Sequence, residues 1–189
     1  MCALLTDDAG RAAAYPHGTA RAPINSPGPG GAWAARSPFP DGRTGRVVLI
    51  DDEPVIAMVV RKYLVSAGYT DCTITCDAIE ALDLIERTDP DVVLLDIVMP
   101  AFNGLDLLAS IRETWGPGQP PVIMLTATDD RETKHRAFAL GATDFLAKPV
   151  DPSELIARIR NVLWAKAHRD YLRDHAAAGR DGQPAHDPA

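Results

Sequence analysis

The strongest constraint on the fold is a regular alternation of two kinds of segment that begins at Arg46. Short runs rich in apolar and β-branched residues, bounded by Asp, Gly or Pro, are typical of strands, and the segments between them carry apolar residues at helical spacing. The run at 92–95 is apolar at every position, as expected of a strand buried on both faces. This alternation predicts an α/β fold, a doubly wound parallel sheet with helices on both faces. The predicted strands are 47–50, 70–76, 91–95, 122–125 and 143–147.

The helix after the last strand is predicted to continue beyond the domain. Trp164, Ala167, Tyr171 and Leu172 keep the helical spacing, and no helix breaker occurs before Gly179. We therefore place the α/β domain at 46–165. Residues 166–189 are predicted to be a helical extension, reaching about residue 178, followed by a frayed tail.

The first 45 residues differ in composition from the rest of the chain. Of these 45 positions, 23 are Ala, Gly or Pro, and the few large apolar side chains show no period. Such a segment buries too little surface to offset the entropy of ordering it, so 1–45 is predicted to be a disordered leader. The alternative is a docking segment that uses Trp33 and Phe39.

Charge and apolar patterning exclude several classes of protein. The formal net charge is −7, and within 46–165 there are 11 basic and 19 acidic residues, a net of −8, which disfavours direct DNA binding. The apolar runs are far too short to span a bilayer, and the N-terminus lacks the pattern of a secretory signal. We expect a cytoplasmic protein without a membrane segment.

Polar residues follow four of the five predicted strands. Asp51 and Asp52 follow the first strand, Asp96 the third, Thr126 the fourth and Lys148 the fifth. Ligands of open parallel sheets bind outside the carboxyl ends of the strands, so these side chains are expected to meet at one edge. Clustered carboxylates need a hard cation or a lysine, and carboxylates with water are the usual ligands of Mg²⁺. The set suits phosphoryl transfer to a carboxylate nucleophile.

Four motifs in order resemble the receiver domain of two-component response regulators. They are 49–54 (LIDDEP), 94–100 (LLDIVMP) with Asn103-Gly104, 123–127 (IMLTA) and 141–149 (GATDFLAKP). The resemblance covers about two thirds of the chain and implies the flavodoxin-like fold of chemotaxis regulators, with strand order 2-1-3-4-5. It suggests the single-domain type without an output domain.

By this resemblance Asp96 is the phosphoacceptor. Asp52, Asp96 and the backbone carbonyl of Val98 would bind Mg²⁺ directly, and Asp51 would act through water. Lys148 would pair with the bound phosphate.

The same resemblance assigns the switch to Thr126, which would turn inward to hydrogen-bond the phosphate, and to Phe145, which would follow it. Core packing is an equally good reading of Phe145. The Lys148–Pro149 bond is expected to be cis. Val98 and Thr128 occupy the positions that often modulate loss of the phosphoryl group, and neither offers a carboxylate or amide to orient an attacking water, so we expect a phosphoryl lifetime that is not unusually short.

Two functional readings remain open. In the first, the protein takes phosphate from a histidine kinase or phosphotransfer protein. It then binds an unknown downstream protein, or passes the phosphate on, through the face of its fourth and fifth helices. In the second, the C-terminal extension is the output and drives a phosphorylation-dependent homodimer. A phosphatase with an aspartate nucleophile would need an acid at position 98, which is Val98. We therefore expect no enzyme beyond slow autodephosphorylation.

Overall fold

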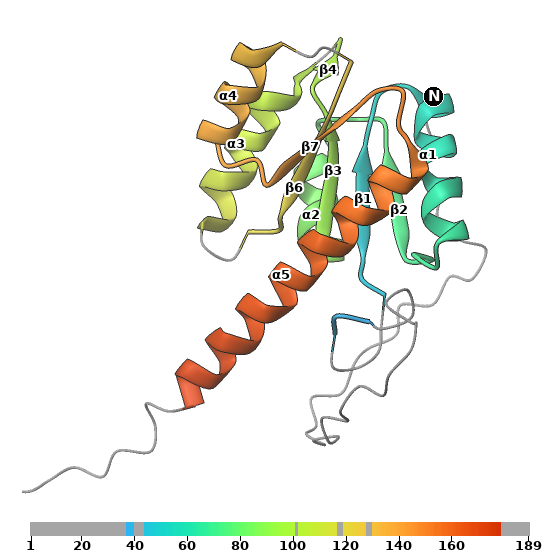
Figure 1. The fold of residues 1–189 in the computed structure, drawn as a ribbon. Coiled ribbons are helices and arrows are strands. Elements are labelled where there is room, and N and C mark those ends of the chain that lie inside the picture. The colour runs from blue at the N-terminus through green and yellow to red at the C-terminus, as the bar shows by residue number, and fades with distance from the viewer. Residues whose placement is uncertain (1–36, 40–43, 101, 117–118, 128–129, 179–189) are drawn as a thin grey trace, which may run out of the picture.

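The computed structural model describes residues 37–39, 44–100, 102–116, 119–127 and 130–178. Its centre is a five-stranded sheet in the order β2-β1-β3-β6-β7, with every neighbouring pair parallel (Figure 1). In order of the strands along the chain this is 2-1-3-4-5, so the predicted fold and strand order are confirmed. The strands are β1 Val47–Ile50, β2 Cys72–Thr75, β3 Val92–Asp96, β6 Val122–Thr126 and β7 Asp144–Ala147.

A small hairpin was not predicted from the sequence. The strands β4 (Val98–Met99) and β5 (Phe102–Asn103) pair antiparallel directly after β3. Two-residue strands are too short to carry a period of alternation, so the sequence pattern holds no signal for them. The hairpin carries the chain away from the end of β3 and into the next helix.

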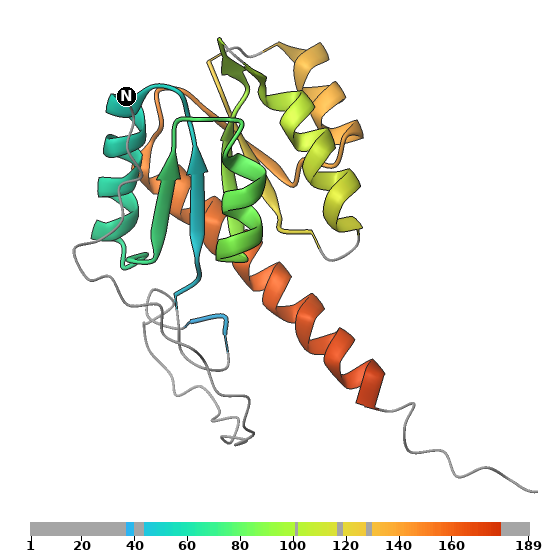
Figure 2. The ribbon, with the colours of Figure 1, turned by 180° about the vertical axis from the view of Figure 1, so that it is seen from behind.

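Five helices cover the two faces of the sheet. The helices α1 and α5 lie on one face, whereas α2, α3 and α4 lie on the other; Figure 2 shows α2 in front of the strands and α5 behind them. Each face of the sheet has its own apolar core. Successive side chains of the central strands point to opposite faces, so alternate residues pack into one core or the other. The helices are α1 Pro54–Ser66, α2 Ala81–Thr88, α3 Gly104–Trp115, α4 Arg131–Ala139 and α5 Pro152–Ala178.

Local chemistry explains where the first and last helices begin. Pro54 is the first residue of α1, where its missing N–H costs nothing. The side chain of Asp151 accepts a hydrogen bond from the backbone N–H of Glu154 at 2.9 Å, which caps α5 just before Pro152.

Phe39 belongs to the packed domain, whereas the sequence placed it in the leader. Its side chain is 8 % exposed and forms part of the core between the sheet and the α1/α5 layer. A β-carbon built on Gly45 would lie 3.1 Å from both the Phe39 ring and Leu163, so the three residues are in close contact. The packed domain therefore begins before Arg46. Trp33, the other residue of the docking alternative, lies outside the described residues.

The helix α5 continues beyond the sheet to Ala178, as predicted (Figure 1). Its first turn past the domain is attached to the core, because the ammonium of Lys166 lies 3.5 Å from the buried Asp91 and Ala167 packs against the core. Farther along, the side chains of Tyr171 and Leu172 are exposed. Within the described residues, no helix combines the length and the apolar character needed to cross a membrane.

Candidate phosphoacceptor site

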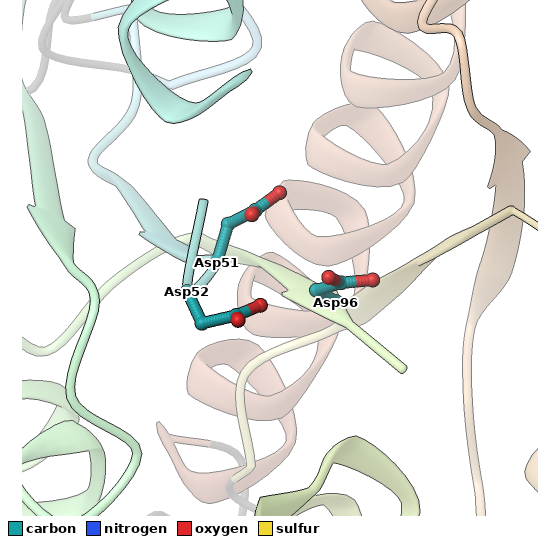
Figure 3. A group of neighbouring side chains, drawn as sticks. All are labelled: Asp51, Asp52 and Asp96. Atoms are coloured by element: carbon teal, nitrogen blue, oxygen red, sulfur yellow. The ribbon is translucent and has the colours of Figure 1, made fainter. Parts of the chain in front are cut away.

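The polar residues predicted to meet do so at the carboxyl edge of the sheet. Asp51 and Asp52 follow β1, and Asp96 is the last residue of β3, the strand hydrogen-bonded to β1. One carboxylate oxygen of each residue lies within 4.8 Å of those of the other two. Figure 3 shows the three side chains clustered at the ends of these adjacent strands.

Lys148 links the two deepest carboxylates. Its ammonium nitrogen lies 2.8 Å from Asp96 Oδ2 and 2.9 Å from Asp51 Oδ2. The lysine side chain is only 9 % exposed, and both carboxylates are buried. A lysine so deep in a protein is held by its charge partners and is not a solvated rim residue. Glu53, which the sequence motif included without a role, approaches the same nitrogen at 3.8 Å.

Burial and hydrogen bonding act in opposite directions on the titration of this pair. Burial raises the pKa of the Asp51 carboxyl above its ordinary value, although hydrogen bonds from Lys148 and from the backbone N–H of Glu53 act to lower it. For Lys148, burial acts to lower the pKa, but hydrogen bonds to Asp96 and Asp51 outweigh it and the pKa is raised. The lysine therefore stays charged near neutral pH.

The donor set fits a divalent cation. Asp51 and Asp96 share one ammonium group and Asp52 lies beside them, which leaves an excess of negative charge at close range. One oxygen of Asp52, Oδ1, is buried and has no hydrogen-bond partner within the described part of the chain. An unpaired buried carboxylate oxygen is costly, and a hard cation is the group that such oxygens satisfy best.

Asp96 is held in place by the loop that follows it. Its Oδ1 accepts a hydrogen bond from the backbone N–H of Val98 at 3.4 Å, and the N–H of Gly104 donates to the carbonyl of Ile97 at 2.9 Å. A β-carbon on Gly104 would lie 2.0 Å from the backbone oxygen of Asp96, so only glycine fits there. The sequence contained the Asn103-Gly104 pair as a motif, but not this contact.

Thr126 and Phe145 lie on the same face of the sheet. Phe145 on β7 is paired with Met124 on β6, and Thr126 is two residues farther along β6, so all three side chains project to the α3/α4 side. Both Thr126 and Phe145 are buried. The backbone N–H of Lys148 donates to the carbonyl of Thr126 at 2.7 Å, which ties the end of β7 to the end of β6.

The remaining expectations have mixed outcomes. The Lys148–Pro149 peptide bond is cis, as expected. Val98 lies in the β4/β5 hairpin, two residues after Asp96, with its side chain 62 % exposed. Thr128 lies outside the described residues, so its predicted place near the site stays a prediction.

Comparison with known proteins agrees with this geometry. Residues 47–160 match the family model described as the response regulator receiver domain. The chain is 35 % identical, over 136 residues, to the transcriptional regulatory protein TrcR of Mycobacterium tuberculosis, a match that covers 72 % of this chain and 52 % of that protein. The chain thus spans about half the length of this curated relative.

Solved structures of receivers have the same fold. The Francisella response regulator 1452 receiver domain is 34 % identical, with a TM-score of 0.58 over 65 % of this chain and 98 % of that one. The chemotaxis protein CheY4 of Vibrio cholerae is 31 % identical, with a TM-score of 0.58 over 62 % of this chain and 97 % of that one. The chain belongs to the response regulator receiver family.

Proposed function

We propose that Asp96 is the phosphoacceptor of a two-component or phosphorelay system. The observation that carries the proposal is the buried carboxylate of Asp96, with the Lys148 ammonium at 2.8 Å and two further carboxylates beside it. In the reaction, a carboxylate oxygen of Asp96 attacks the phosphorus of a phosphohistidine. The P–N bond breaks, the imidazole leaves with the electron pair, and an acyl phosphate forms.

Each neighbouring side chain has a defined part in this step. Lys148 balances negative charge on the phosphoryl oxygens, and Asp52, Asp96 and the backbone carbonyl of Val98 would hold Mg²⁺, with Asp51 acting through water. Bound Mg²⁺ supplies charge neutralisation for the phosphoryl oxygens. The hydroxyl of Thr126 then turns toward the phosphoryl group, and Phe145 follows.

The rim of the site is suited to a protein donor. Exposed apolar side chains stand on both sides of the acidic edge, Val55 and Met58 on α1 and Val98 and Phe102 on the hairpin, with exposed fractions of 74 %, 59 %, 62 % and 41 %. Such an apolar rim favours docking of a histidine kinase or phosphotransfer protein over a small anion alone. After phosphorylation, the α4–β7–α5 face would bind a downstream protein or present the phosphate for transfer, in the cytoplasm.

Phosphoryl uptake from a small donor tests this proposal. Incubation with acetyl phosphate and Mg²⁺ is expected to add one phosphoryl group, measured by intact-protein mass spectrometry. Asp96→Asn abolishes the addition, whereas Asp106→Asn, which changes an exposed carboxylate on α3, leaves it intact. Uptake by the Asp96→Asn protein at the wild-type level would overturn the assignment. Decay of the mass signal is expected to take longer than seconds, so a half-life of seconds contradicts the predicted lifetime.

A second output is favoured by one specific observation. The extension of α5 carries Trp164, Tyr171 and Leu172 with exposed fractions of 45 %, 50 % and 53 %. A helix with such a stripe can pair with a second copy, although three or four heptads are usual for a coiled coil. Light scattering with Mg²⁺, with and without beryllofluoride as a stand-in for the phosphate, tests it. A dimer that requires Asp96 supports this output, and an unchanged mass favours partner binding or phosphate transfer.

A further inference from the structure

The two helices that cover one face of the sheet, α1 and α5, enclose a hollow that the phosphoacceptor site does not use. Its volume is about 390 Å³, and it lies where the C-terminal part of α1 meets the first turns of α5. The residues that line it include Tyr63 and Ala67 on α1 and Ser153, Ile156, Ala157 and Arg160 on α5. Tyr63 and Ile156 also pack against the α1/α5 core, so the floor of the hollow is continuous with that core.

The lining of the hollow combines apolar surface with two kinds of polar group. Ile156 and Ala157 are apolar, Ser66 and Ser153 carry hydroxyls, and Arg160 carries a guanidinium group. An indole ring is apolar over most of its surface, but its N–H needs an acceptor when it is buried, and its face attracts a cation more strongly than other aromatic rings do. The hollow therefore suits a tryptophan side chain better than an aliphatic one.

The packed residue Phe39 determines where the leader meets the domain. It lies in the α1/α5 core beside Leu163, and the backbone N–H of Phe39 donates to the Ser37 hydroxyl at 3.0 Å, so the chain turns at this point. Along α5, Ile156 precedes Leu163 by seven residues, a distance of about 10 Å. Trp33 precedes Ser37 by four residues, a stretch of chain that can reach about 13 Å. The chain thus carries a tryptophan on a tether long enough to reach the hollow.

We propose that the leader docks through Trp33 into this hollow and lies as a strap across the α1/α5 face. A short tether gives the tryptophan an effective concentration in the millimolar range, so the docked state persists even where the same contact between separate molecules is weak. The strap occupies surface that another protein would otherwise contact, and the leader therefore controls access to the α1/α5 face. This inference does not depend on the phosphoacceptor assignment, and its test does not involve phosphate.

Tryptophan fluorescence on the full chain tests the docking. The chain has three tryptophans, so Trp115→Phe combined with Trp164→Phe leaves Trp33 as the single emitter. Circular dichroism first establishes that this background is folded. We expect blue-shifted emission from Trp33 and slow quenching by acrylamide, and both should change to the values of the unfolded chain when urea is added. Emission and quenching that already have the unfolded values in the folded protein overturn the proposal.

Filling the hollow then tests the position of the docked ring. Ala157→Phe puts a ring where the indole would lie and should bring the Trp33 emission and quenching to the unfolded-chain values. Ala165→Phe is the matched control, because it makes the same change at an exposed position of the same helix outside the hollow, and it should leave Trp33 protected. Arg160→Gln keeps the apolar walls and removes the cation, so it should weaken the protection even if Ala157→Phe does not fold. Trp33 that stays fully protected in every folded variant of the hollow overturns the proposal. Protection that disappears on dilution shows docking between two copies and overturns the tethered strap.

Discussion

The strand β3 has a buried aspartate near each end, and the two are balanced in opposite ways. Asp91 precedes the strand and is 1 % exposed; Arg46 donates its backbone N–H to it at 2.8 Å, and the side chains of Arg46 and Lys166 lie within ion-pair distance. Asp96 ends the strand and shares Lys148 with Asp51, beside Asp52. At the first end Asp91 faces two cations, which also pair with Asp89 at 2.9 Å and Asp170 at 2.7 Å nearer the surface. At the second end the single cation Lys148 faces Asp51, Asp96 and, at 3.8 Å, Glu53, with Asp52 beside them. At the Asp96 end the carboxylates outnumber the cations at close range, so Asp96 is available for a metal ion and a phosphoryl group. At the other end Asp91 is paired with cations on both sides, and its role is to stabilise the fold.

The largest expected effect comes from disturbing the backbone at the Asp96 end. Gly104→Ala places a β-carbon 2.0 Å from the carbonyl oxygen of Asp96, a backbone atom that can move only with the hairpin. We expect a loss of about 3 kcal/mol of unfolding free energy, measured by urea denaturation. Gly68→Ala is a control, because its φ of 95° strains alanine but no atom lies within 4 Å of the new β-carbon. Gly104 does not have a positive φ, so its loss cannot come from φ strain; a loss no larger than that of Gly68→Ala would show that the contact with the Asp96 carbonyl is relieved at little cost.

Asp91, at the other end of β3, is expected to affect the stability of the fold but not phosphoryl uptake. Asp91→Asn removes one carboxylate partner of Lys166 and one of Arg46, but the two cations keep Asp170 at 2.7 Å and Asp89 at 2.9 Å, and their side chains are 21 % and 35 % exposed. We expect a loss of about 2 kcal/mol in the same measurement, below the full penalty for a buried pair. Phosphoryl uptake from acetyl phosphate should be unchanged once the protein is folded. Reduced uptake at a temperature where the variant is fully folded contradicts the separation of the two ends.

Added metal should stabilise only the Asp96 end. Mg²⁺ at ten times its dissociation constant raises the unfolding free energy by about 1.4 kcal/mol. This gain should vanish in Asp52→Asn, where an amide replaces the carboxylate with the unpaired oxygen, and persist in Asp91→Asn. Thermal melts with and without Mg²⁺ measure it, and an equal gain in all three proteins would place the cation elsewhere.

Without metal, the excess of carboxylates should lower stability. Because burial raises the pKa of Asp51, the folded chain binds this proton more tightly than the unfolded chain does. The contribution of this group to stability is therefore greatest at acid pH and falls as the pH rises through the raised pKa. Asp51→Asn removes this loss, so in chelator the variant should become more stable than the wild type as the pH approaches neutrality. Urea titrations across the pH range check the sign, and a variant that is less stable at pH 7 would show that the Lys148 contact dominates.

The acidic end could be predicted from sequence because topology alone assembles it. Once five strands alternate with helices, the residues that follow each strand must share an edge, and Asp51, Asp96 and Lys148 meet there as expected. The contacts of Asp91 and Phe39 could not be predicted in this way. Asp91 contacts Arg46 and Lys166, and Phe39 lies close to Leu163, and no periodic pattern relates residues so far apart in the sequence. Phe39 also stands among Pro and Ser in a composition typical of disorder. The edge-to-face contact between the rings of Phe138 on α4 and Phe145 on β7 depends on how α4 is rotated, which its weak apolar pattern leaves open.

The extension of α5 also has a mechanical consequence. Leu163 is buried and Lys166 reaches Asp91, so the root of the helix is clamped while the residues beyond it project away from the domain. The helix continues for fifteen residues after Leu163, up to Ala178, a length of about 22 Å at 1.5 Å per residue. A rotation of about 5° at the clamp would sweep the tip through about 2 Å on this lever. A small rotation of α5 near Leu163 therefore becomes a displacement near Ala178 that a distance measurement between spectroscopic labels can resolve.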